Sequence, residues 1–89
     1  MFQNRHLERV VKGFANHRRI AMMNLLQKEP ELSLQDISDK LKINIKTGSE
    51  HLRRLTIAGL VLKRNKANKV LHKLSPRGES ILEFLSKLE

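Results

Sequence analysis

The sequence has no cysteine and few aromatic residues, with three phenylalanines and neither tryptophan nor tyrosine among its 89 residues. Without cysteine there can be no disulfide and no thiolate metal site, a composition typical of a reducing cytosol. So few aromatic rings offer poor stacking platforms for single-stranded nucleic acid. No apolar run approaches the roughly 20 residues that span a bilayer, and the N-terminus lacks the apolar stretch of a secretory signal. We therefore expect a cytoplasmic protein with no membrane partner.

Motifs that carry catalysis or bind cofactors are also missing. There is no Gly-rich phosphate loop, no His-Glu-x-x-His pair and no nucleophile elbow. Near the C-terminus, Glu79 and Glu83 alone make too small and too hard a ligand set for a selective transition-metal site. We expect no enzyme activity, no cofactor and no metal, and interpret the four scattered histidines as structural: His6, His17, His51 and His72.

Positive charge is what the chain has in excess, with 18 Lys and Arg against 9 Asp and Glu, a net +9. Between residues 42 and 73 lie nine basic residues and one acid, Glu50, a net +8, whereas the other 57 residues carry +1. One contiguous third of the chain therefore holds nearly all the excess, which is the pattern of a nucleic-acid surface. The alternative is a basic face that is merely solvated.

The length and the absence of repeats or linkers indicate one domain over residues 1–89. Apolar spacing predicts a helix over about 3–13 and a second, strongly apolar and central helix over 17–28, ending before Pro30.

Ser33 and Asp36 form a capping signal for a short third helix. After a turn, Asn44 is the expected N-cap of a fourth helix over about 45–58, and Gly59 is its expected stop. Two helices joined by so short a turn make a helix-turn-helix.

After the helices the apolar period changes to that of strands. Apolar runs at 60–64 and 70–74, separated by a polar, basic tip at 65–69, predict a β-hairpin. A Ser-Pro pair then opens a final helix over about 76–88. The predicted fold is mainly α (α+β): a winged helix-turn-helix with a β-hairpin wing and an extra helix at each end.

The helix over 45–58 carries two separate stripes. Gly48, Leu52 and Leu55 point inward, and a polar stripe points elsewhere. A polar stripe alone is usually only solvated. As the second helix of a helix-turn-helix, next to a basic hairpin, it favours side chains that read base edges in a major groove about 12 Å wide. The candidates are Lys46, Ser49, Glu50 and Arg53, with Thr47 beside them.

The predicted hairpin offers a second contact, to the phosphate backbone or minor groove, which supplies affinity rather than sequence choice. Lysines on an exposed hairpin also block edge-to-edge aggregation, and both roles can hold together. The candidate phosphate contacts are Lys42, Arg54, Lys63, Arg64, Lys66, Lys69 and Lys73.

From about Phe14 to Ser75 the chain resembles the arsenic-repressor (ArsR-type) winged-helix transcriptional regulators. The His-Leu-Arg-Arg-Leu run followed by Ala-Gly-Leu-Val is typical of winged-helix regulators in general, so the related MarR-type group is an alternative. The segments that carry the resemblance are Phe14–Ile20, Ser33–Leu41, Asn44–Leu55 and Ala58–Val61.

The resemblance implies that the DNA-reading positions are Ile45, Lys46, Thr47, Ser49 and Glu50. A Gln is common at the position of Ile45 and a His at that of Glu50, so a base preference cannot be carried over. Glu50 could accept from a cytosine amine or pair with Lys46 or Arg54 one turn away, and we favour the pair. Gly48 replaces an apolar residue at a cost of about 1 kcal/mol relative to Ala, which close approach to the third helix would compensate.

The outer helices carry apolar stripes that need a further surface, because the central helices already have one another. One alternative is that the two stripes pack on each other within a single chain, without a partner. We predict instead a homodimer whose two-fold axis sets two recognition helices about 34 Å apart. The predicted interface is Leu7, Val10, Val11, Phe14, Ile81, Phe84, Leu85 and Leu88.

Together these features predict a sequence-specific regulator of transcription that binds double-stranded DNA, a homodimeric repressor found on the nucleoid when bound. One alternative is a winged-helix module that binds a protein partner or structured RNA through its basic face. Another is a ligand sensor with its effector in the dimer interface, for which the sequence offers no convincing pocket.

Overall fold

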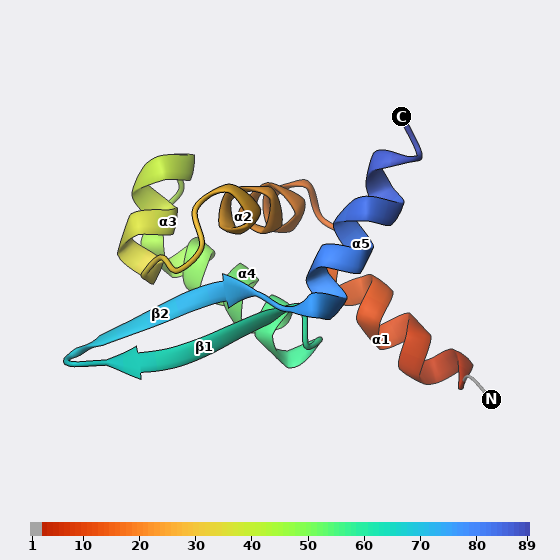
Figure 1. The fold of residues 1–89 in the computed structure, drawn as a ribbon, viewed down its shortest axis with the longest axis horizontal. Helices are drawn as coiled ribbons and strands as arrows, with labels where there is room; N and C mark the ends of the chain where they lie inside the picture. The colour runs from red at the N-terminus through yellow and green to blue at the C-terminus, as the bar shows by residue number, and fades with distance from the viewer. Residues whose placement is uncertain (1–2) are drawn as a thin grey trace.

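The computed structural model describes residues 3–89 as five helices and one antiparallel two-stranded sheet (Figure 1). The predicted winged helix-turn-helix with an additional helix at each end is confirmed. Within the described residues, no helix is both long enough and apolar enough to cross a bilayer. The elements are α1 Asn4–Phe14, α2 His17–Lys28, α3 Leu34–Leu41, α4 Ile45–Ile57, β1 Val61–Lys66, β2 Lys69–Leu74 and α5 Pro76–Ser86.

Side-chain caps begin the helices where the sequence predicts them. Ser33 and Asp36 close a complete capping box on α3, and Asn44 accepts from two first-turn amides of α4 at 2.8 and 3.4 Å. Between these helices Lys42 adopts the left-handed conformation, with φ of +55°. That single residue turns the chain, so α3 and α4 form the helix-turn-helix.

Ser75 joins the base of the hairpin to the start of α5. Its hydroxyl donates to the carbonyl oxygen of Gly59 at 2.6 Å and accepts from the amide of Gly78 at 3.0 Å. Its own amide donates to the carbonyl oxygen of Leu60 at 3.0 Å. The predicted cap on α5 is confirmed, and the same side chain also holds the two ends of the hairpin together.

The core forms around α2, which is the central buried helix, as predicted. Met22, Met23 and Leu26 of α2 are almost fully buried. Phe14, predicted as part of a dimer interface, is only 8% exposed and packs in the core of its own chain. Leu82 anchors α5 to the same core. Hydrophobic burial thus ties both terminal helices to the domain.

The predicted five-residue hairpin tip is wrong. The strands stay paired out to Lys66 and Lys69, leaving only Ala67 and Asn68 in the loop. Ala67 has φ of +56°, a conformation that glycine adopts far more readily. Two-residue hairpin loops usually contain Gly or Asn-Gly, and this sequence has neither at the loop positions, so the short loop could not be predicted.

A short third strand position was not predicted. Leu32 pairs with His72 through two backbone hydrogen bonds of 2.8 and 3.1 Å, on the free edge of β2. This bridge anchors the base of the hairpin to the segment before α3. The molecule measures 41 × 27 × 21 Å, with α1 and α5 at one end of the long axis and the hairpin tip at the other (Figure 1).

Candidate nucleic-acid interface

The α4 helix has the two faces that the sequence predicts. Gly48, Leu52 and Leu55 are buried. A Cβ on Gly48 would lie 2.6 Å from the hydroxyl of Ser38 on α3, so glycine permits the close approach of the two helices, as expected. The predicted base-reading side chains are exposed on the outer side, apart from the half-buried Thr47: Ile45, Lys46, Ser49, Glu50 and Arg53.

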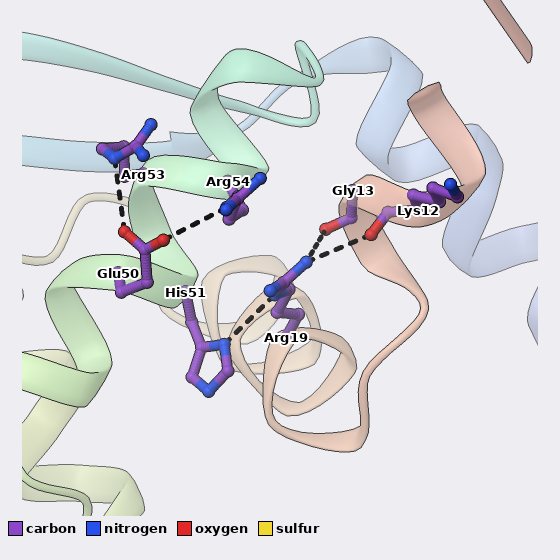
Figure 2. Close-up of polar contacts among 7 residues, drawn as sticks. All are labelled: Lys12, Gly13, Arg19, Glu50, His51, Arg53 and Arg54. Carbon is purple, nitrogen blue, oxygen red and sulfur yellow. Dashed lines mark hydrogen bonds and ion pairs between the residues drawn. The ribbon is translucent and has the colours of Figure 1, made fainter. Parts of the chain in front are cut away.

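An ion-pair cluster lies on the outer side of α4. Glu50 accepts from Nε of Arg53 at 3.3 Å and from Nε of Arg54 at 3.1 Å (Figure 2). The bond from Arg54 and the charge of Arg53 hold the pKa of Glu50 below its usual value. The predicted pair with Arg54 is confirmed. The alternative partner Lys46 has no acid within 4 Å in residues 3–89.

The cations of the hairpin divide between its two faces, because successive side chains in a strand alternate. Lys63 lies on the face of the buried Val61, directly opposite His72 in the ladder. Arg64 lies on the other face and forms a bidentate pair with Glu31, whose carboxylate it contacts at 2.6 Å through Nη2. That pair lowers the pKa of Glu31. In the free protein Arg64 therefore shares its charge with Glu31, while its side chain stays 53% exposed.

The four lysines of the hairpin are different. All are exposed, and none has an acid within 4 Å in the part of the chain that the structure describes. Lys42, in the helix-turn-helix turn, is exposed and unpaired in the same sense. These side chains are free to meet an external anion. The four hairpin residues are Lys63, Lys66, Lys69 and Lys73.

A groove of about 640 Å³ runs between α3, α4 and the hairpin. Ser49 and Arg53 of α4 line it on one side, and Lys63 and Lys69 of the hairpin on the other. Cations on both sides of a groove attract a polyanion, because their fields add across the gap. The groove, which Leu52, Ile57 and Val70 also line, thus connects the outer face of α4 to the hairpin.

Two histidines make long-range contacts that the sequence does not reveal. Nδ1 of the buried His72 lies 3.1 Å from the carbonyl oxygen of Leu32, and burial lowers the pKa of this ring. His51 on α4 accepts a hydrogen bond at its Nδ1 from Nε of Arg19, 32 residues earlier, at 3.1 Å (Figure 2). Among residues 3–89, no three His, Cys, Asp or Glu side chains gather as metal ligands would.

The apolar residues predicted for a dimer interface are only partly brought together. Phe14 is in the core, and Val10, Ile81 and Leu85 are half-buried against it. The more exposed members remain uncovered within the chain, with Phe84 and Leu88 56% and 65% exposed. They are Leu7, Val11, Phe84 and Leu88.

A helix-turn-helix followed by a basic hairpin defines the winged-helix class. The model of the bacterial regulatory protein, arsR family, matches residues 16–63, more than half of the chain. The chain belongs to the ArsR family, a family of winged-helix, DNA-binding transcription regulators.

Solved structures agree with this assignment. HlyU from Vibrio cholerae is 31% identical over 99% of this chain and 97% of its own, with a TM-score of 0.82. The homodimeric DNA-binding domain of Mb0332 from Mycobacterium bovis, a possible ArsR-family regulator, is 26% identical over 93% of this chain and 76% of its own, with a TM-score of 0.80. NolR from Sinorhizobium fredii, at 24% identity over 96% and 85%, shares the fold, with a TM-score of 0.86. A search of curated proteins returned no match.

Proposed function

We propose that this protein is a sequence-specific regulator that binds double-stranded DNA as a homodimer and represses transcription by occluding its site. The observation that carries the proposal is the exposed polar side of α4 beside a hairpin with four unpaired lysines, joined by one groove. Such a protein needs no cofactor or metal. It would act in the cytoplasm, on the nucleoid when bound to DNA.

The two parts of the surface have separate roles in this proposal. Lys46, Thr47 and Ser49 lie near the N-terminal end of α4, with no ion pair within the described residues, and would meet base edges. Arg53, which the sequence assigns to base edges, would instead approach the DNA backbone together with Arg54, because both arginines pair with Glu50. The hairpin lysines and Lys42 contact phosphates, which supplies affinity and register.

Dimerisation would use the terminal helices. The exposed apolar residues of α1 and α5 lie at the opposite end of the long axis from the hairpin tip, where they would not compete with DNA (Figure 1). The related Mb0332 domain is described as homodimeric. A two-fold axis through these helices would present two α4 helices to successive major grooves, about 34 Å apart.

The test of the DNA-binding roles begins with selection of bound sequences from a random duplex library. Lys46→Ala and Ser49→Ala should reduce the preference for the selected site over a scrambled one, by about 1–3 kcal/mol each. Lys66→Ala and Lys69→Ala should weaken both sequences by the same factor. Reversed effects would exchange the two roles. Tighter binding to double-stranded RNA, or no selectable sequence, would contradict the proposed function.

The dimer has its own test. Phe84→Glu combined with Leu88→Glu should give a monomer in sedimentation at micromolar concentration and lower affinity for the selected site by at least about 100-fold. The control, Asn24→Glu with Gln27→Glu, adds the same charge to exposed positions of α2 and should remain a dimer. A wild-type monomer that binds a palindromic site tightly would refute the dimer.

A further inference from the structure

Arg19 completes the C-terminal end of α1. The last four carbonyl groups of a helix lack partners within the helix. Following backbone amides donate to the oxygens of Val11 and Phe14, at 3.0 and 2.7 Å. Nη1 of Arg19 donates to the two between them, Lys12 at 3.1 Å and Gly13 at 3.3 Å (Figure 2). One guanidinium thus satisfies both remaining carbonyls.

The same guanidinium also holds α4. Its Nε donates to Nδ1 of His51 at 3.1 Å, so Arg19 lies between the end of α1 and the middle of the recognition helix (Figure 2). The two helices also touch directly at the C-terminal end of α4, since a Cβ on Gly13 would overlap that of Ala58. Arg19 therefore bridges a predicted dimerisation helix to the helix that would read DNA.

This bridge requires one protonation state of His51. Arginine stays charged and can only donate, so Nδ1 of His51 must be the unprotonated acceptor, with the ring proton on Nε2. A protonated imidazole carries a hydrogen on both nitrogens and would face the Arg19 donor with a donor of its own. Protonation and the Arg19–His51 bond exclude each other.

The charges around His51 favour the neutral ring. Burial, followed by the charges of Arg19 and Arg18, lowers the pKa of His51, and His17 acts in the same direction. Glu50 on the same helix acts the other way, but its carboxylate is engaged by two arginines. The folded state binds this proton more weakly than the unfolded chain does. The contribution of neutral His51 to stability is therefore full above about pH 6.5, the ordinary histidine pKa, and is lost as pH falls through the lowered pKa of His51.

We propose that Arg19 is a positioning residue that fixes α4 relative to α1, and that it does so only while His51 is neutral, so acidification weakens DNA binding. The proposal rests on α4 being the recognition helix. It predicts the opposite sign from simple electrostatics: a protonated His51 adds positive charge, which by itself would tighten binding to DNA.

Three variants separate positioning from charge. Arg19→Lys keeps the charge but cannot bond to α1 and His51 together, and should weaken binding to the selected site about tenfold, or about 1.4 kcal/mol. Arg18→Lys, the same change at the exposed neighbour, is the control and should bind as the wild type does. His51→Gln offers an acceptor that does not titrate, and should keep high affinity.

Binding is measured by titration at about pH 7.5 and about pH 5, on either side of the ordinary histidine value. The wild type should lose about tenfold in affinity on acidification relative to His51→Gln, which cancels the contributions of the other histidines. Arg19→Lys should show no such extra loss. Ring-nitrogen NMR of the free protein should find the Nε2–H tautomer of His51 at the higher pH.

The outcomes distinguish this proposal from the proposed function. If Lys46→Ala and Lys66→Ala act as expected but Arg19→Lys binds as Arg18→Lys does, the positioning role is refuted and DNA recognition stands. Tighter wild-type binding at low pH relative to His51→Gln, or an Nδ1–H tautomer, also overturns it. Indifference of DNA binding to all these substitutions would refute the proposed function itself.

Discussion

The α4 helix and the β-hairpin carry most of the excess charge of the chain, and they hold it in different ways. The α4 helix packs against α1, α2, α3 and β1, and its two arginines share one carboxylate. The hairpin is exposed from Leu62 to Val70, and its lysines have no acid partner within residues 3–89. Packing therefore fixes the positions of the side chains on α4, whereas the hairpin mainly presents exposed positive charge.

The largest effect is expected when the positive charge of the hairpin is removed. Replacing Lys63, Lys66 and Lys69 with Ala should lower the slope of log K against log salt by about 5 per dimer, at about 0.9 for each phosphate contact. The loss should be equal for all duplex sequences. A control that removes three other lysines, Lys12, Lys28 and Lys87, changes the net charge equally and should leave most of the slope. Equal slopes for both triples would mean that net charge alone matters.

A smaller effect is expected when the arginines of α4 are released. Glu50→Gln should tighten binding to random duplex several-fold, because two guanidiniums become free and a negative charge is lost. The ratio of the affinity for the selected site to the affinity for random duplex should fall. Glu79→Gln on α5 is the matched control, with the same charge change at an exposed position. If Glu50→Gln instead loses affinity only for sites with cytosine, Glu50 reads a base directly.

The smallest effect concerns the hairpin tip alone. Ala67→Gly should raise the free energy of unfolding by under about 1 kcal/mol, because φ of +56° strains alanine more than glycine. Denaturant unfolding measures it, and DNA binding should not change. Ala21→Gly within α2 is the contrasting control and should destabilise by about 1 kcal/mol. A loss of stability for Ala67→Gly would mean that chain entropy outweighs the relief of strain.

The sequence predicts those features that are encoded locally. The caps at Ser33, Asn44 and Ser75 are each a short polar side chain two or three residues before the amides that they bond, so the helix starts could be predicted directly. The apolar composition of α2 likewise predicts that this helix is buried at the centre of the domain. The close approach at Gly48 was predictable because a glycine inside a helix has a cost that needs compensation.

The contacts that the sequence does not predict join residues far apart. Glu31 meets Arg64 across 33 residues, and Arg19 meets His51 across 32. No spacing rule connects such pairs, since they depend on how whole helices and strands are packed. The prediction of the hairpin tip was wrong for another reason. The length of the loop is set by strand pairing, which extends to the polar pair Lys66 and Lys69. Ala67 is therefore left at a loop position with positive φ that is better suited to glycine.

The hydrogen bonds of Ser75 at the base of the hairpin have a mechanical consequence. They fasten Gly59, Leu60 and the start of α5 at a point where Val61 and Leu74 are buried, and the Leu32–His72 bridge and the Arg64–Glu31 pair hold the hairpin further out. Within the described residues, positions 65–70 at the tip form no hydrogen bond or ion pair to another element. We therefore expect the tip, which carries Lys66 and Lys69, to change its position more readily than the base. Under the proposed function, such a movement would let one domain meet duplexes whose groove widths differ without moving α4.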